Sequence, residues 1–247
     1  MMTRLCLTSA AICMVCAPLG GCLNGYATFR GTKTTTVAHV AGSPLDVNTE
    51  NGSITIIVAA RGDVQIESRF AATTAERLAA ASVEAVRKPD GTLSVHAVWP
   101  DGKAIGSEEC AFTITLPDAK GLTLKTSNGS IKSGTTSGTM NAQTSNGSVS
   151  IQNHSGEATV HTSNGSVEFA LADDSSGPVG IRTSNGAVTL EVGKAFTGAL
   201  SASTSNGKIS YEGFDTAASN NALQVGASTT PSKVKTSNGR VSIRRRN

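Results

Sequence analysis

The chain has 247 residues, a net charge of +3, 26 glycines and an aromatic content of 4%. A charge excess this weak excludes the strongly basic class of nucleic-acid-binding proteins, and so few aromatic side chains argue against a bulky globular core. The length suffices for one large all-β domain.

The first segment has the three parts of an export signal. One positive charge at Arg4 precedes an apolar run over residues 5–17, and Leu19-Gly20-Gly21-Cys22 follows. The apolar run is too short to remain in a bilayer as a spanning helix. Small residues directly before a cysteine resemble the processing site of bacterial lipoproteins. We therefore predict a signal peptide over residues 1–21 and lipidation of Cys22.

After the cysteine we predict a flexible tether over residues 22–36 and a single β-solenoid domain over residues 37–247. Leu23 follows the cysteine in place of an aspartate, which resembles the default signal for the outer membrane. We expect a cell-envelope protein held to the membrane by acyl chains on Cys22, with the outer membrane favoured. We expect the protein on either the periplasmic side or the cell-surface side of this membrane.

The first half of this domain, residues 37–120, has irregular elements. Alternating apolar residues over 54–58 and 64–66 predict strands that form a divergent first coil. Thr73-x-x-Glu76 is a capping box and predicts a short helix. Lys88-Pro89-Asp90-Gly91 separates two strand patterns and predicts a hairpin.

One cysteine, Cys110, lies outside the predicted signal and lipidation site. It shares its strand parity with Phe112, Ile114 and Leu116, so its side chain is expected on the buried face. We interpret it as a structural thiol without a disulfide partner, because no acid or base is near it in sequence.

The second half, residues 121–247, repeats one motif six times: Thr-Ser-Asn-Gly, a variable residue, then Ile or Val. A divergent earlier copy begins at Thr49. Successive Asn residues from Asn128 are 18, 18, 21, 21 and 32 positions apart, a period typical of solenoids. The Asn-Gly pairs, which we expect to form a ladder of stacked turns, are Asn51-Gly52, Asn128-Gly129, Asn146-Gly147, Asn164-Gly165, Asn185-Gly186, Asn206-Gly207 and Asn238-Gly239.

Apolar residues alternate between these turns, and a second set of breakers lies midway at Gly138, Gly156, Gly180 and Gly198. The pattern predicts coils of 18–21 residues with two strands and two turns each. We expect the turn glycines to adopt positive φ and the threonines of the motif to form a hydroxyl ladder. We expect the Gly239 turn to be the terminal turn of the stack. The long last interval predicts an inserted loop over residues 215–231.

These elements together resemble the bacterial putative-adhesin family of repeat domains of unknown function. The resemblance rests on the strand opening, the helix and hairpin excursion, the aliphatic strand ending in Leu116-Pro117 and the Thr-Ser-Asn-Gly coils. It spans about residues 37–243 and implies a β-solenoid on exported or membrane-anchored bacterial proteins. The family name implies adhesion, and the family contributes no catalytic residues.

The candidate chemistry is sparse. Asp173-Asp174 lies in a Ser-Gly-rich loop and is interpreted as a solvated turn. The histidines do not have metal-ligand spacing, so no metal or cofactor is predicted; they are His39, His96, His154 and His161. The last arginines allow two interpretations, an end-cap against edge pairing and a contact for an anionic envelope polymer; they are Arg240, Arg244, Arg245 and Arg246.

We therefore expect a non-enzymatic, lipid-anchored envelope protein, an adhesin or binding module that presents a Ser/Thr/Asn-rich face to a glycan or a protein. Nucleic acid is not an expected partner. One alternative is a carbohydrate-active β-helix enzyme of the polysaccharide lyase kind, which requires acidic and basic residues that converge on one sheet. Another is an accessory component of envelope signalling or assembly.

Overall fold

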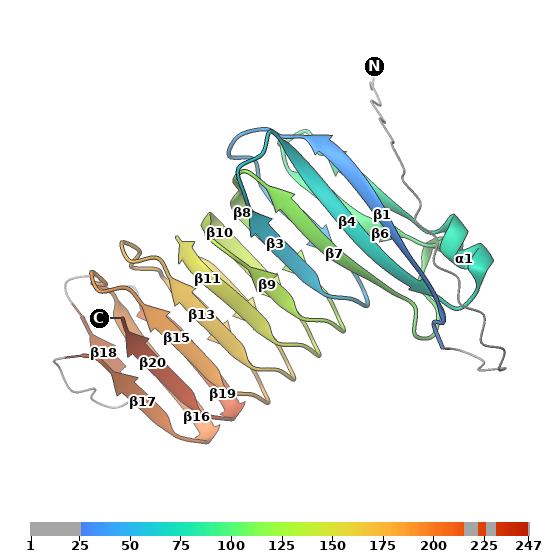
Figure 1. Ribbon diagram of the computed structural model, residues 1–247. Helices are drawn as coiled ribbons and strands as arrows, with labels where there is room; N and C mark the ends of the chain where they lie inside the picture. Colours follow the sequence, from blue (N-terminus) through green and yellow to red (C-terminus); the bar gives the residue numbers. More distant parts are fainter. Residues whose placement is uncertain (1–25, 215–221, 226–230, 247) are drawn as a thin grey trace.

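The computed structural model describes residues 26–214, 222–225 and 231–246, so the predicted signal peptide, Cys22 and most of the predicted inserted loop lie outside the described residues. The described residues form twenty strands, one α-helix and one short 3-10 helix (Figure 1). In this part of the chain, no helix is long and apolar enough to cross a membrane.

Nine elements precede the regular coils. They are β1 (Phe29–Ala38), β2 (Leu45–Asn48), β3 (Ile54–Val58), β4 (Asp63–Ala72), α1 (Ala75–Ala80), β5 (Ser82–Arg87), β6 (Leu93–Val98), the 3-10 helix η1 (Pro100–Gly102) and β7 (Glu109–Leu116).

The regular coils contribute two main strands each, one to each side of the solenoid. The strands of this half are β8 (Lys120–Lys125), β9 (Ile131–Ser133), β10 (Thr136–Gln143), β11 (Val149–Ser155), β12 (Ala158–His161), β13 (Val167–Leu171), β14 (Val179–Arg182), β15 (Val188–Val192), β16 (Ala199–Asn206), β17 (Ile209–Glu212), β18 (Ala222–Gln224), β19 (Pro231–Asn238) and β20 (Val241–Arg245).

Two layers of strands enclose the core, and we call them the front sheet and the rear sheet after their places in Figure 1. The front sheet has the order β1-β4-β7-β3-β9-β11-β13-β15-β20-β17. The rear sheet has the order β5-β6-β2-β8-β10-β12-β14-β19-β16-β18. Pairing is parallel along the coils, including the terminal pair β20–β17, and antiparallel in the pairs β1–β4, β4–β7, β5–β6 and β16–β18. The predicted single-domain β-solenoid with two strands per coil is confirmed.

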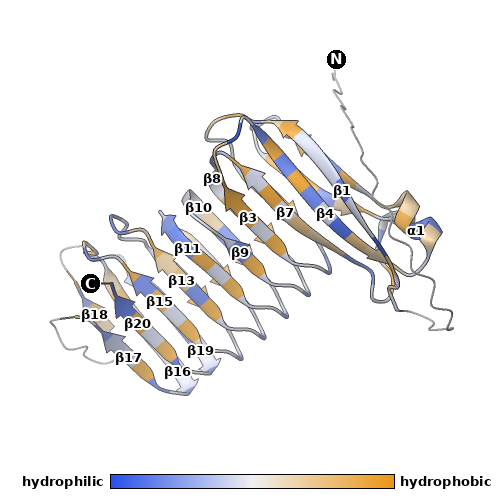
Figure 2. Cartoon of the chain, in the orientation of Figure 1, coloured by the Kyte–Doolittle hydropathy of each residue, from blue (hydrophilic) through white to orange (hydrophobic). Residues whose placement is uncertain are grey.

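The core lies between the sheets because every second side chain of a strand points inward. Inward residues stack on their equivalents in the next coil, as Ile131, Val149 and Val167 do along the front sheet. Apolar and polar positions alternate along the strands in Figure 2. One coil buries too few aliphatic side chains to offset the entropy of ordering its backbone, so each coil depends on its neighbours.

The helix and the hairpin that were predicted within residues 37–120 are both present. Helix α1 is present, but its N-cap is Thr74, whose hydroxyl accepts a hydrogen bond from the backbone N–H of Arg77 at 3.2 Å. The predicted cap, Thr73, donates its hydroxyl to Glu108 instead. Strands β5 and β6 form the predicted hairpin around Lys88 and Gly91.

Two sequence-based boundaries need correction. The flexible tether predicted over residues 22–36 does not reach residue 36, because β1 begins at Phe29 and pairs with β4 along its whole length. Strand β1 is rich in threonine and its burial does not alternate clearly, so hydrophobic periodicity did not reveal it. Gly180 does not break a coil: it lies inside β14, and the turn is at Gly177-Pro178.

The last coil of the chain is not the last coil of the stack. Strand β19 lies between β14 and β16, and β20 lies between β15 and β17. The 231–245 segment therefore inserts between two coils that precede it in sequence. The expectation that the Gly239 turn is terminal is wrong: among the described turns, the Gly207 turn ends the stack. The long interval before Asn238 gives the chain enough length to return past one coil.

The Asn-Gly turns form a continuous column. From Asn128 onward, each Asn Nδ2 donates to the Oδ1 of the Asn in the preceding coil at 2.7–2.9 Å, in the stacking order 51, 128, 146, 164, 185, 238, 206. The motif threonines do not bond to one another. Their hydroxyls donate to the glycine carbonyl of the preceding coil at 2.9–3.1 Å.

Positive φ is not why these turns use glycine. Of the seven turn glycines, only Gly52 has φ in the left-handed region, at 131°. In the other six, an added Cβ would lie 1.9–2.1 Å from the carbonyl oxygen of the glycine in the preceding coil. Glycine is required because the turns stack in direct backbone contact.

Candidate binding groove

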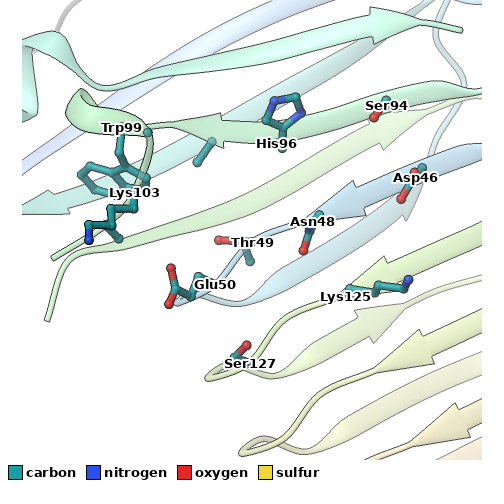
Figure 3. Close-up of a pocket in the computed structure, with 13 residues that line it drawn as sticks. Asp46, Asn48, Thr49, Glu50, Ser94, His96, Trp99, Lys103, Lys125 and Ser127 are labelled. Atoms are coloured by element: carbon teal, nitrogen blue, oxygen red, sulfur yellow. The ribbon is translucent and has the colours of Figure 1, made fainter. Parts of the chain in front are cut away.

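A cavity of about 740 Å³ opens on the outer surface of the rear sheet, over strands β2, β6 and β8. Leu45 and Val47 point into the core, so Asp46 and Asn48 between and beyond them point outward into this cavity (Figure 3). We call the cavity the groove. Its lining residues are Asp46, Asn48, Thr49, Glu50, Ser94, His96, Ala97, Trp99, Gly102, Lys103, Ala104, Lys125 and Ser127.

Strand register brings the floor of the groove together from three distant segments. Asn48 is the register partner of His96 on one side and of Lys125 on the other. Ser94 and Asp46 form the adjacent row. This row-by-row arrangement places amide, hydroxyl, imidazole and ammonium groups side by side, which suits a ligand with many hydroxyl or carbonyl groups.

The segment from Trp99 to Ala104 forms one wall of the groove. Trp99 is only 8% exposed and packs edge-on against Phe70, with ring centroids 5.4 Å apart. Most of the indole is therefore part of the core, and the wall is anchored to it.

A buried ion pair fixes this wall. The guanidinium of Arg77 donates to both carboxylate oxygens of Glu108 at 2.7 and 2.8 Å, and to the carbonyl of Lys103 at 3.1 Å. Glu108 also accepts from the backbone N–H groups of Thr73 and Ile105. Sequence reasoning missed this cluster because Arg77 and Glu108 are 31 positions apart with no shared motif.

The electrostatic balance at Glu108 favours its charged form. Burial disfavours the carboxylate, but hydrogen bonds from Arg77, Thr73 and Ile105 outweigh burial and lower the pKa of Glu108 to about 2. The charged pair is thus a permanent structural clamp between α1, the groove wall and β7 at neutral pH.

Two titratable side chains that line the groove, Asp46 and His96, have partners. Lys88 Nζ contacts Asp46 Oδ2 at 2.9 Å, and this hydrogen bond raises the pKa of Lys88. His96 Nε2 is 3.3 Å from Glu84. Among the described residues, no hydroxyl that lines the groove is hydrogen-bonded to a histidine or a carboxylate, as an activated nucleophile requires. The groups present can bind a polar ligand by hydrogen bonds.

The C-terminal arginines are largely engaged within the chain. Arg244 pairs with Glu212 at 3.2 Å, Arg245 donates to the carbonyl of Lys194, and Arg246 contacts Asp173 at 3.2 Å. The end-cap interpretation of Arg244–246 is wrong, because β20 is an interior strand of the front sheet. Arg240 is exposed in the turn before β20. Asp173 and Asp174 are exposed in a loop, as expected for a solvated turn.

The four histidines lie apart. His39 is 3.4 Å from Asp118, His96 faces the groove, and His161 points outward from β12. His154 is buried within β11 rather than in a turn, and burial lowers its pKa. The described residues contain no group of three or more His, Cys, Asp or Glu side chains that could hold a metal ion.

Cys110 lies on the buried face of β7, within the described ranges. Burial raises the pKa of its thiol far above the ordinary range, so the reactive thiolate is not formed at neutral pH. The thiol is free in this structure. These properties are those of a structural side chain and not of a nucleophile.

Known proteins resemble this chain along nearly all of the solenoid. A family model described as Toastrack DUF4097 matches residues 33–244. A putative cell adhesion protein from Clostridium sporogenes is similar in structure, with 13% identity and a TM-score of 0.39 over 87% of this chain and 100% of that chain. A putative adhesin from Bacteroides fragilis gives 15% identity and a TM-score of 0.41 over 87% and 97%. No curated protein matches the chain.

Proposed function

The chain belongs to the Toastrack DUF4097 family, and from that premise we propose that it is a non-enzymatic, lipid-anchored envelope protein that binds a glycan or protein ligand in the groove of the rear sheet. Cys22 carries the lipid in this proposal, and the outer membrane is its favoured location. The resemblance that the repeats predicted is confirmed by the family match.

One observation carries the proposed binding role: the groove is the place where outward polar side chains of three strands meet a fixed wall. Asn48, His96 and Lys125 form its floor in strand register, so their positions are set by backbone pairing. A preorganised site loses little side-chain entropy when a ligand binds. Hydroxyl, amide and charged groups in one concave surface favour a glycan.

The groove is tested by filling it. Asn48→Trp should weaken the binding of envelope oligosaccharides by about tenfold or more, because a large side chain on the floor excludes the ligand. The matched control is Gln152→Trp, since Gln152 is also exposed but lies on β11 of the front sheet, away from the groove. The measurement is titration calorimetry of the purified mature protein with neutral and acidic oligosaccharides.

Equal losses in the two variants would place the binding surface elsewhere. Release of shortened or unsaturated sugar products during these titrations would reverse the non-enzymatic assignment in favour of a polysaccharide lyase.

The lipid anchor is tested separately. Cys22→Ala should move the protein from the membrane fraction to the soluble fraction and abolish the acyl mass on the mature N-terminus, because several acyl chains on one residue hold a protein to a bilayer almost permanently. Cys16→Ala is the control, since Cys16 is expected to leave with the signal peptide. A Cys22→Ala protein that stays in the membrane with an unchanged N-terminal mass rules out the anchor.

A further inference from the structure

The rear sheet carries a row of outward side chains that runs along the solenoid axis. Strand register aligns one residue from each of five successive strands, β8, β10, β12, β14 and β19. We call this set the basic row; its members are Lys125, Gln143, His161, Arg182 and Lys235. Four of the five are exposed and His161 is half-buried.

Acidic residues are missing from the same strands. Strands β8, β10, β12, β14, β19 and β16 contain no Asp or Glu at any position. A second outward row beside the first adds Lys233, which is the register partner of Gly180. The strands from β8 to β16 therefore carry cations on β8, β14 and β19 and no carboxylate.

The regular-coil strands of the front sheet differ, because they carry carboxylates: Glu168, Glu191 and Glu212 lie on β13, β15 and β17. Their cations are Lys132 on β9 and the arginines of β20, of which Arg244 pairs with Glu212. Among the strands of the regular coils, carboxylates therefore lie on one sheet only, and a polyanion is attracted to the sheet that has cations and no carboxylates.

The three lysine and arginine side chains of the basic row have no partners among the described residues. Neither an ion pair nor a side-chain hydrogen bond involves Lys125, Arg182 or Lys235, whereas the C-terminal arginines are engaged. Arg182 and Lys235 are register partners on neighbouring strands. Like charges placed opposite each other destabilise a sheet, so this arrangement is unfavourable for the free protein. An anionic ligand would relieve the repulsion.

We infer that the basic row binds a linear acidic polysaccharide that lies along the solenoid axis and enters the groove at Lys125. Neighbouring strands are about 4.8 Å apart, so the row offers one side chain for each step of that length. This step is close to the length of one sugar unit in an extended polysaccharide chain. Lys125 belongs to both the row and the groove, so one ligand can occupy both.

This inference rests on the proposed binding function and specifies the charge and the direction of its ligand. It is tested with polygalacturonate of defined length as the probe and neutral dextran as the uncharged comparison. The variant Lys125→Gln/Arg182→Gln/Lys235→Gln neutralises the row. The control Lys132→Gln/Lys208→Gln/Arg240→Gln removes the same charge at three exposed positions outside the rear sheet.

The row variant should bind polygalacturonate about tenfold more weakly or worse at low ionic strength, because three charge contacts with the polymer are lost. The control should change binding by less than about twofold, and added salt should weaken the wild type more than the row variant. The row variant should melt slightly above the wild type, because it removes the repulsion between Arg182 and Lys235, whereas the control should melt at the wild-type temperature because its three side chains are exposed.

Three results would overturn the inference. Equal losses in the row variant and the control mean that net charge alone attracts the polymer. Equal affinity for duplex DNA or for anionic lipid vesicles, lost in the same variant, means that the partner is not a polysaccharide. If Asn48→Trp abolishes binding and the row variant still binds, the ligand site is the groove and the basic row is not part of it. If the row variant loses binding and Asn48→Trp still binds, the basic row is the site and the proposed role of the groove is wrong.

Discussion

Gly147→Ala should lower the free energy of unfolding by at least about 3 kcal/mol, although it adds a single methyl group. The added Cβ would lie 2.0 Å from the carbonyl oxygen of Gly129 and 2.5 Å from its carbonyl carbon. Both atoms are backbone, so no side chain can move aside. Separating the two turns breaks the Asn ladder and the bond from Thr144 to the Gly129 carbonyl.

Gly134→Ala is the matched control for this substitution. Gly134 also lies in the regular coils, but an added Cβ there meets nothing within 4 Å and its φ is not in the left-handed region. Its effect should stay within about 0.5 kcal/mol. Urea unfolding of both variants measures the difference. A Gly147→Ala protein as stable as the control would contradict the close stacking of the turns.

The same substitution in the last two turns of the stack tests the order of the coils. Gly239 contacts the Gly186 turn on one side and the Gly207 turn on the other, whereas Gly207 has a described neighbour on one side only. Gly239→Ala should therefore destabilise the protein more than Gly207→Ala, because strain reaches two interfaces instead of one. If the coils stacked in chain order, the ranking would be reversed.

Glu108→Ala should destabilise the protein by about 3–5 kcal/mol, because it leaves the guanidinium of Arg77 without its partner in a site that is largely closed to water. The carboxylate is fully buried, and the Arg77 side chain is 14% exposed. The substitution also removes the acceptor for the N–H groups of Thr73 and Ile105. Thermal melting measures the loss.

Glu109→Ala is the control, since Glu109 is the next residue and its ion pair with Arg30 is exposed, at 3.7 Å. Its cost should be below about 1 kcal/mol. Similar losses at the two positions would show that the buried ion pair of Glu108 contributes no more stability than the exposed ion pair of Glu109. Ligand affinity in the groove should fall only in the Glu108 variant, since Arg77 also holds the carbonyl of Lys103 in the wall.

The ion pair between Arg77 and Glu108 also predicts that the stability of the protein depends on pH in the acidic range. The pKa of Glu108 is lowered from 4.5 to about 2 on folding, so its contribution is fully present above about pH 4.5 and is lost as the pH falls toward 2. Wild-type protein should lose stability across that interval. Glu108→Gln should lack this component while keeping the neighbouring backbone hydrogen bonds partly satisfied.

The sequence alone determines the repeat architecture of this protein. Alternating apolar residues set the strands, the Asn-Gly spacing sets the length of each coil, and Thr-x-x-Glu and Lys-Pro-Asp-Gly mark the helix and the hairpin. These signals are local, because each depends on the backbone preferences of a few consecutive residues. The basic row also has a sequence signal, since Lys125, Arg182 and Lys235 each directly precede the threonine of a motif copy.

Only the tertiary structure decides the contacts between distant segments. Either of the last two motif copies could stack on the Gly186 turn, since both have the same Thr-Ser-Asn-Gly sequence, and the path of the returning chain selects Gly239. Strand β1 is held by backbone pairing with β4 and not by an apolar pattern. Arg77 and Glu108 meet because α1 packs against β4, the strand that pairs with β7. The groove exists because register aligns three segments that are far apart in sequence.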